Sequence, residues 1–179
     1  MIKRTEFNIA ELTQKDALSL STLMVSNAER FRRFFPLTLA QNLTVADSEA
    51  YILKKQGEIK SKTEFTFAIK EKEFRTLVGL VILKELDWTK KQGELAYCID
   101  QKHEGKGWMT HSVDQISKHT FNELGLQTLQ IIAHKSNIGS IKVAEKCGYK
   151  WQKTLPKAYT PPNEVPLDME LYEFRTCEA

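Results

Sequence analysis

The chain has 179 residues, of which 41% are hydrophobic and 27% charged, and its formal net charge at pH 7 is only +3. This composition is typical of an ordinary soluble globular protein, and the length suits one domain with its own core. No apolar run approaches the roughly 18 residues that a membrane span needs, so no membrane protein is expected. Because both signs of charge are scattered along the chain, no nucleic-acid partner is predicted.

The start of the chain and its cysteines indicate a cellular compartment. The first residues, MIKRTEFNIAEL, lack an apolar segment behind the basic ones, so no signal peptide is expected. The three cysteines, Cys98, Cys147 and Cys177, are odd in number and far apart. They predict neither a disulfide framework nor a metal pair, and they favour a reducing cytoplasm. The four histidines show no metal-ligand spacing, so no metal site is expected.

The first half of the chain is predicted to hold a strand, two helices and three further strands. Thr13 and Thr44 each precede an aspartate by three residues, which is the spacing of a capping box at a helix start. Between the two helices lies an aromatic and basic segment that ends at Pro36. The expected elements are a strand over 2–9, helices over 13–27 and 44–60, and strands over 65–70, 77–83 and 94–99.

The second half is predicted to begin with a glycine-containing turn and a helix that ends at Gly125. A strand over 128–133, a short helix from Asn137 to Gly148 and two closing strands follow, the last over 169–174. The expected fold is an α/β (α+β) single domain, with a mixed, mostly antiparallel twisted sheet flanked by helices. The strand–helix–strand unit over 94–133 is its expected parallel element.

The turn before the first of these helices has the features of an anion site. Gly105 and Gly107 let backbone N–H groups approach a ligand, the helix dipole points its positive end the same way, and Lys106 adds a charge. Such a loop suits a pyrophosphate, although many Gly-x-Gly loops simply turn. A Walker loop is excluded because Trp108 follows Gly107, and a dinucleotide fingerprint is excluded because Thr110 replaces its third glycine.

Two ordered motifs resemble a known family. The segment QKHEGKGWMT between a strand and a helix, followed by NIGSIKVAEKCGY at 137–149, is similar to the GNAT superfamily of acetyltransferases. Within it, the similarity is to the RimJ/RimL-like branch, which acetylates the N-termini of ribosomal proteins. FRRFFP at 31–36 and TVADSEAYI at 44–52 extend the resemblance over most of the chain. The fold implied is a single GNAT domain over 1–179.

The resemblance implies acetyl-CoA as cofactor, with its pyrophosphate on the backbone amides of the glycine loop. Lys102 stands where the superfamily motif has Gln or Arg, a change that backbone contacts should tolerate. Amides at Cys98 to Asp100 would hold the pantetheine arm and polarise the thioester carbonyl. The implied cofactor residues are Cys98, Ile99, Asp100, His103, Glu104, Gly105, Lys106, Gly107, Trp108, Met109, Thr110, Asn137 and Ser140.

The sequence identifies the catalytic residues less clearly than the cofactor residues. The resemblance implies that Ser140 donates a proton to the departing thiolate and that Asn137 contacts the pantetheine arm, although both also fit plain helix capping. Glu94, on the strand that leads to the cofactor, is the candidate base, and a solvent-facing carboxylate is an equal alternative. The branch often has a glutamate near Tyr159 that this chain lacks. The acceptor residues predicted are Arg30, Phe31, Phe35 and Tyr159.

The expected activity is direct transfer of acetyl to a primary amine, with a protein N-terminal α-amine as the favoured acceptor. Two alternatives stay open at this point: a small amine such as a polyamine, an amino acid or an aminoglycoside, and a degenerate acyl-CoA-binding module without transfer activity. The sequence leaves a homodimer open and does not identify the acceptor.

Overall fold

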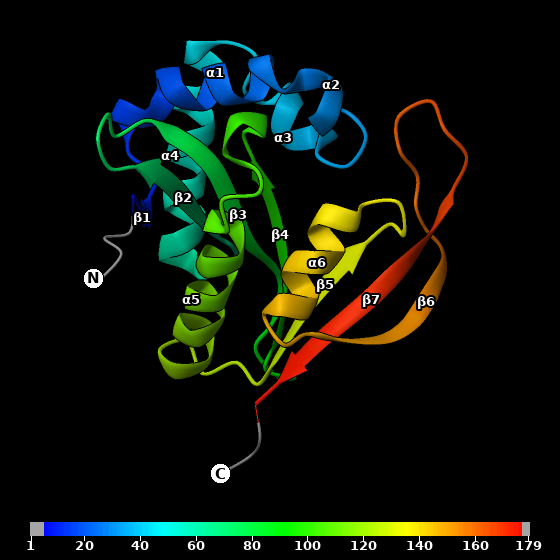
Figure 1. Ribbon diagram of the computed structural model, residues 1–179. Helices are drawn as coiled ribbons and strands as arrows, with labels where there is room; N and C mark the ends of the chain where they lie inside the picture. Colours follow the sequence, from blue (N-terminus) through cyan, green and yellow to red (C-terminus); the bar gives the residue numbers. More distant parts are fainter. Residues whose placement is uncertain (1–5, 177–179) are drawn as a thin grey trace.

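The computed structural model describes residues 6–176, which form one seven-stranded sheet in the order β1-β2-β3-β4-β5-β7-β6 (Figure 1). Every neighbouring pair is antiparallel except β4 and β5, which are parallel. The predicted mixed, mostly antiparallel sheet and its single parallel unit are therefore confirmed. The strands are β1 (Phe7–Glu11), β2 (Phe65–Glu71), β3 (Leu77–Asp87), β4 (Gln92–Ile99), β5 (Thr128–Ala133), β6 (Lys150–Tyr159) and β7 (Leu167–Arg175).

Helices cover both faces of the sheet and enclose two apolar cores. Strand β3 is buried from Leu77 to Leu83 because its alternate side chains enter opposite cores: Val81 packs beneath α5, whereas Leu80 packs beneath α1 and α4. Figure 1 shows α5 and α6 together on one face. The helices are α1 (Ala17–Ser26), α2 (Ala28–Phe31), α3 (Pro36–Ala40), α4 (Val45–Ser61), α5 (Trp108–Asn122) and α6 (Ile138–Lys146). None of them, within residues 6–176, is both long and apolar enough to cross a bilayer.

The two predicted capping boxes form at helix starts. Thr44 Oγ1 accepts the N–H of Asp47 at 3.1 Å, and the Asp47 carboxylate accepts the N–H of Thr44 at 3.0 Å. At a short 3₁₀ turn (Gln14–Asp16) that leads into α1, the Asp16 carboxylate likewise accepts the N–H of Thr13, at 2.7 Å, while the Asp16 N–H donates to the Thr13 carbonyl at 2.9 Å. The Asp16 carboxylate also accepts from Lys70 Nζ at 2.7 Å, so this helix start is anchored to β2.

Three parts of the chain fold differently from the prediction, and β3 also continues beyond its predicted end at Leu83 to Asp87. The aromatic and basic segment folds into α2 and α3, whose four and five residues are too few for a helical period to be visible. The penultimate strand is β6, which is exposed almost throughout and so has no alternation of apolar and polar residues. The first strand begins at Phe7 and extends to Glu11, while residues 2–5 of the predicted strand lie outside the described residues.

The feature that positions the site is the separation of β4 from β5. Their parallel pairing joins Gln92–Glu94 to Thr128–Gln130 and stops there, although β4 continues to Ile99 and β5 to Ala133. The two strands therefore diverge and leave unpaired backbone groups at the open end. Helix α5 follows β4 and helix α6 follows β5, so both helices begin at this open end (Figure 1).

Candidate active site

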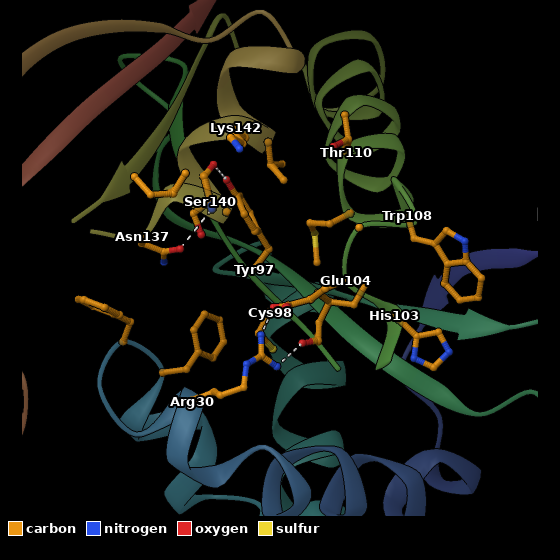
Figure 2. Close-up of a pocket in the computed structure, with 18 of the residues that line it drawn as sticks. Arg30, Tyr97, Cys98, His103, Glu104, Trp108, Thr110, Asn137, Ser140 and Lys142 are labelled. Carbon is orange, nitrogen blue, oxygen red and sulfur yellow. Dashed lines mark hydrogen bonds and ion pairs between the residues drawn. The ribbon is translucent and has the colours of Figure 1, made fainter. Parts of the chain in front are cut away.

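A cavity of about 800 Å³ lies where β4 and β5 diverge (Figure 2). Four segments contribute to its wall: the end of β4, the loop that leads into α5, the first turns of α6, and the aromatic segment after α1. Of the predicted site residues, fourteen line it: Arg30, Phe31, Phe35, Cys98, Ile99, His103, Glu104, Gly105, Gly107, Trp108, Met109, Thr110, Asn137 and Ser140.

The start of α5 has the geometry of an anion site. Gly105 and Gly107 adopt φ angles of +72° and +78°, a left-handed conformation that favours glycine, and Gly107 is the N-cap. No side chain caps this end, and the first helical hydrogen bond runs from the N–H of His111 to the carbonyl of Gly107. The amides of the first turn, 108–110, are therefore available to an anion. A Cβ added at either glycine would meet nothing within 4 Å, so the space beside them is open to a ligand such as a diphosphate.

Aromatic stacking holds the loop in place. Trp108 is only 6% exposed, and its ring lies 4.9 Å from that of Phe7 and 5.0 Å from that of His103. Lys106 does not line the cavity, and its Nζ lies 5.3 Å from the centroid of the Trp108 ring. The cavity wall carries other cationic side chains, among them Lys142 and Lys146 of α6.

The unpaired backbone of β4 faces the cavity through alternate residues. The N–H of Asp100 donates to the carbonyl of Val78 at 2.8 Å, so this amide is bound to β3 and cannot hold a pantetheine arm. By the alternation of an antiparallel pair, the amide of Cys98 also points to β3, and those of Tyr97 and Ile99 point to the gap. The prediction of Cys98 and Asp100 amides is corrected accordingly, whereas Ile99 is retained.

The Cys98 side chain is a buried thiol, 7% exposed. Burial raises its pKa to about 12, so it stays protonated at neutral pH. This agrees with the interpretation of Cys98 as a small buried strand residue, and a thiol in this state is a poor nucleophile.

The first turn of α6 faces the cavity and is fixed from two sides. Asn137 Oδ1 accepts the N–H of Ser140 at 3.2 Å, so the asparagine caps the helix while it lines the cavity. The hydroxyl of Tyr97 donates to the carbonyl of Ser140 at 2.8 Å and so connects β4 to α6 across the gap. Figure 2 shows the three side chains together, with both hydrogen bonds drawn.

One wall of the cavity is formed by the aromatic segment after α1. Tyr159 lies outside the lining, but its hydroxyl donates to the carbonyl of Arg33 at 2.7 Å and its ring lies 6.0 Å from that of Phe34. Arg33 in turn forms a two-bonded ion pair with Glu164, both bonds 2.8 Å long. The segment 160–166 between β6 and β7 is thereby held against the residues after α2.

Glu94, the predicted base, does not reach the cavity. It lies near the start of β4, where its carboxylate is 3.0 Å from Lys84 Nζ, and it is absent from the lining. Its prediction as the base rests on its place in the strand that leads to the cofactor, but several residues of β4 separate it from the cavity. No group of three His, Cys, Asp or Glu side chains in residues 6–176 is arranged to hold a metal ion.

Some lining residues were missed by the sequence analysis. Tyr97 could have been found, because strand alternation places it on the opposite face from the buried Cys98. Lys142 and Lys146 are spaced by one helical turn, which places them on one face of α6. The missed residues are Arg33, Phe34, Tyr97, Ser136, Ile138, Gly139, Lys142, Val143 and Lys146.

The site thus combines a splayed strand pair with a helix start that presents free backbone amides. Residues 7–150 match the family described as "Acetyltransferase (GNAT) domain". The chain belongs to the GNAT family. As a member of it, the protein is an N-acetyltransferase that uses acetyl-CoA.

Three relatives illustrate the range of this family. The protein named "Probable N-acetyltransferase YjcK" of Bacillus subtilis is 27% identical over 150 residues, 83% of each chain. A spermidine N(1)-acetyltransferase of Vibrio cholerae is 24% identical over 91 residues, 51% of this chain and 52% of its own. Among solved structures, RimL, a ribosomal L7/L12 alpha-N-protein acetyltransferase in complex with coenzyme A, superposes with a TM-score of 0.86. It shares 13% sequence identity and covers 96% of this chain and 95% of its own, so it shows the same fold.

Proposed function

We propose that this GNAT enzyme acetylates the α-amino group of a protein N-terminus. One observation carries the proposal: Glu104 is the one carboxylate among the described residues that line the cavity, and it is ion-paired with Arg30. The amine must be neutral to attack the thioester. A protein α-amine has a pKa of about 7.7–8.0 and is partly neutral at pH 7, whereas a lysine-type amine near 10.4 needs a base. A cavity without a free carboxylate therefore suits an α-amine, which needs no base.

In this proposal, residues of the chain bind acetyl-CoA and supply one proton. Acetyl-CoA supplies the acetyl group as a thioester. The first-turn amides of α5 and the ammonium groups of Lys142 and Lys146 would hold its diphosphate. The amides of Tyr97 and Ile99 would bind along the pantetheine arm, as would Asn137.

Ser140 would donate a proton to the departing thiolate and regain one through solvent as the acceptor nitrogen loses its proton, although a thiol of ordinary pKa, about 8.5, is already a tolerable leaving group. Glu94 receives no role, because its carboxylate pairs with Lys84 outside the cavity. Phe31 and Phe35 would contact the acceptor.

The charge of the cavity argues against a polyamine acceptor. Besides the paired Glu104, the charged side chains of the lining are Arg30, Arg33, Lys142 and Lys146, all cationic. A polyamine carries further ammonium groups after one is acetylated, and these require carboxylate partners. The spermidine enzyme among the relatives keeps small amines open as the alternative. A cytoplasmic enzyme and a homodimer stay predictions from the sequence.

A matched acceptor panel tests the proposal. Peptides with a free α-amine, the same peptides blocked at the N-terminus but containing lysine, spermidine, and an aminoglycoside would be compared by CoA release and by mass shift. We expect acetylation of the free α-amine, with kcat/KM rising through pH 7.7–8.0 to a plateau. Preference for spermidine or for the lysine side chain would contradict the proposal. Binding of acetyl-CoA without acetylation of any acceptor would indicate a degenerate module.

A further inference from the structure

Glu104 places a negative charge in the loop that receives the cofactor diphosphate. It directly precedes Gly105, lines the cavity, and its side chain is 51% exposed. An unpaired carboxylate at this position would repel the phosphate charges, because like charges disfavour each other over several ångströms in a partly desolvated cavity. The anion site at the start of α5 therefore needs this charge to be neutralised or turned away.

The neutralising charge comes from Arg30, in α2. Its guanidinium forms an ion pair with Glu104 (Figure 2), and its Nη1 donates to Asn27 Oδ1 at 2.8 Å and to the carbonyl of Ile99 at 3.3 Å. These three partners occupy three of the five N–H groups of the side chain. The guanidinium is thereby fixed beside both the end of β4 and the cofactor loop.

A buried asparagine strengthens this connection. Asn27 is 4% exposed, and its Oδ1 also accepts the N–H of Gln101 at 3.1 Å. Its amide nitrogen donates to the carbonyl of Leu23 at 3.0 Å and to the Asp100 carboxylate at 3.3 Å. The end of α1, the start of α2 and the loop after β4 are joined into one polar network. The position of Arg30 is therefore set by the scaffold and does not depend on an acceptor.

We infer that Arg30 is a positioning residue for cofactor binding: it neutralises Glu104 and holds its carboxylate away from the diphosphate. This inference replaces the predicted contact of Arg30 with the acceptor. It depends on the use of acetyl-CoA alone and is independent of which amine is acetylated. It requires the loss of affinity caused by removing Arg30 to be reversed when Glu104 is also made neutral.

A double-mutant cycle measured by calorimetry with CoA, in the absence of acceptor, tests the inference. Arg30→Gln is expected to weaken CoA binding about threefold to tenfold, the range for partly exposed charges. Glu104→Gln alone is expected to tighten it, because the arginine is then an uncompensated cation. The double variant should recover the wild-type Kd to within about twofold. The deficit of Arg30→Gln should shrink at about 0.5 M salt, where screening is stronger.

Arg32→Gln is the matched control. Arg32 is in the same segment and pairs with its own carboxylate, Glu29, but it is exposed and outside the cavity. Its loss should leave the Kd for CoA unchanged. A double variant as weak as Arg30→Gln would show a direct contact of Arg30 with the cofactor and overturn the inference. An unchanged CoA affinity in Arg30→Gln, with a raised acceptor KM, would also overturn it. Should Arg30→Gln fail to fold, Glu104→Gln alone decides, since unchanged or weaker binding contradicts the inference.

Discussion

At the scale of single residues, Gly107 offers the sharpest test of the anion site. Gly107→Asp would place a carboxylate beside the first-turn amides of α5, while Gly107→Asn would place an uncharged side chain of nearly the same size there. Both residues tolerate the observed φ of +78° better than other side chains do, and the space is open. We expect the aspartate variant to bind CoA at least about tenfold more weakly than the asparagine variant, by calorimetry.

The same pair controls for folding. Because an added Cβ meets nothing within 4 Å, the two variants should have similar thermal unfolding midpoints in the absence of ligand. Equal CoA affinities for aspartate and asparagine, both near that of the wild type, would mean that the diphosphate binds elsewhere.

A second residue-scale prediction concerns Ser140, whose backbone and side chain have separable roles. Ser140→Ala removes the hydroxyl proposed to give up a proton, so kcat should fall with little change in the Kd for CoA. Tyr97→Phe removes the hydroxyl that binds the Ser140 carbonyl at 2.8 Å, so it should also lower kcat, through displacement of the α6 turn. It should cost about 1 kcal/mol of unfolding free energy.

The control for Tyr97→Phe is Tyr149→Phe. The Tyr149 hydroxyl pairs with Ser117 Oγ at 2.7 Å in the core, outside the cavity lining. This variant should lose a similar unfolding free energy in urea while kcat stays near the wild-type value. A kcat loss of the same size in both tyrosine variants would make the Tyr97 effect one of stability alone.

At the scale of elements, the sequence predicts those helices and strands whose pattern continues over many residues. The long helices α4 and α5 had clear periods, and the buried part of β3 was an uninterrupted apolar run. All three elements formed, although β3 continues past the predicted end at Leu83 to Asp87. Helices α2 and α3 are not predicted by the sequence, because each is shorter than two turns. Their helical form depends on packing of Phe31 and Leu39 against the α1–α4 core, which is a tertiary effect.

The candidate site shows the same difference between local features and contacts made by residues far apart in the sequence. The glycine loop and the Asn137–Ser140 turn were predictable because each is a local motif whose groups are close in sequence. The pairing of Arg30 with Glu104 spans 74 residues, and no local pattern predicts it. The backbone register of β4 was also not accessible, because only the pairing with β3 decides which amides face the gap. Local chemistry was therefore predictable, and contacts between elements were not.

At the scale of the whole molecule, the stability of the fold should depend on pH through its buried cysteine thiols. Burial raises the pKa of Cys98 to about 12 and that of Cys147 to about 11, whereas an unfolded cysteine titrates near 8.5. The folded state therefore holds these protons more tightly. Their stabilising contribution is complete below pH 8.5 and is lost as the pH rises towards the folded values.

The buried thiol of Cys98 allows a measurement of this effect. We expect the unfolding free energy in urea to be level from pH 7 to 8 and then to fall, with Cys98 contributing up to about 1.4 kcal/mol per pH unit between pH 9 and 10. Buried tyrosines such as Tyr149, whose pKa is also raised by burial, add to the fall only above about pH 10. The Cys98→Ala variant should be less stable at pH 7 but should fall less steeply from pH 8.5 to 10. If the two curves run parallel, Cys98 ionises as easily in the folded protein as in the unfolded chain, and the end of β4 is more open to water than its 7% exposure indicates.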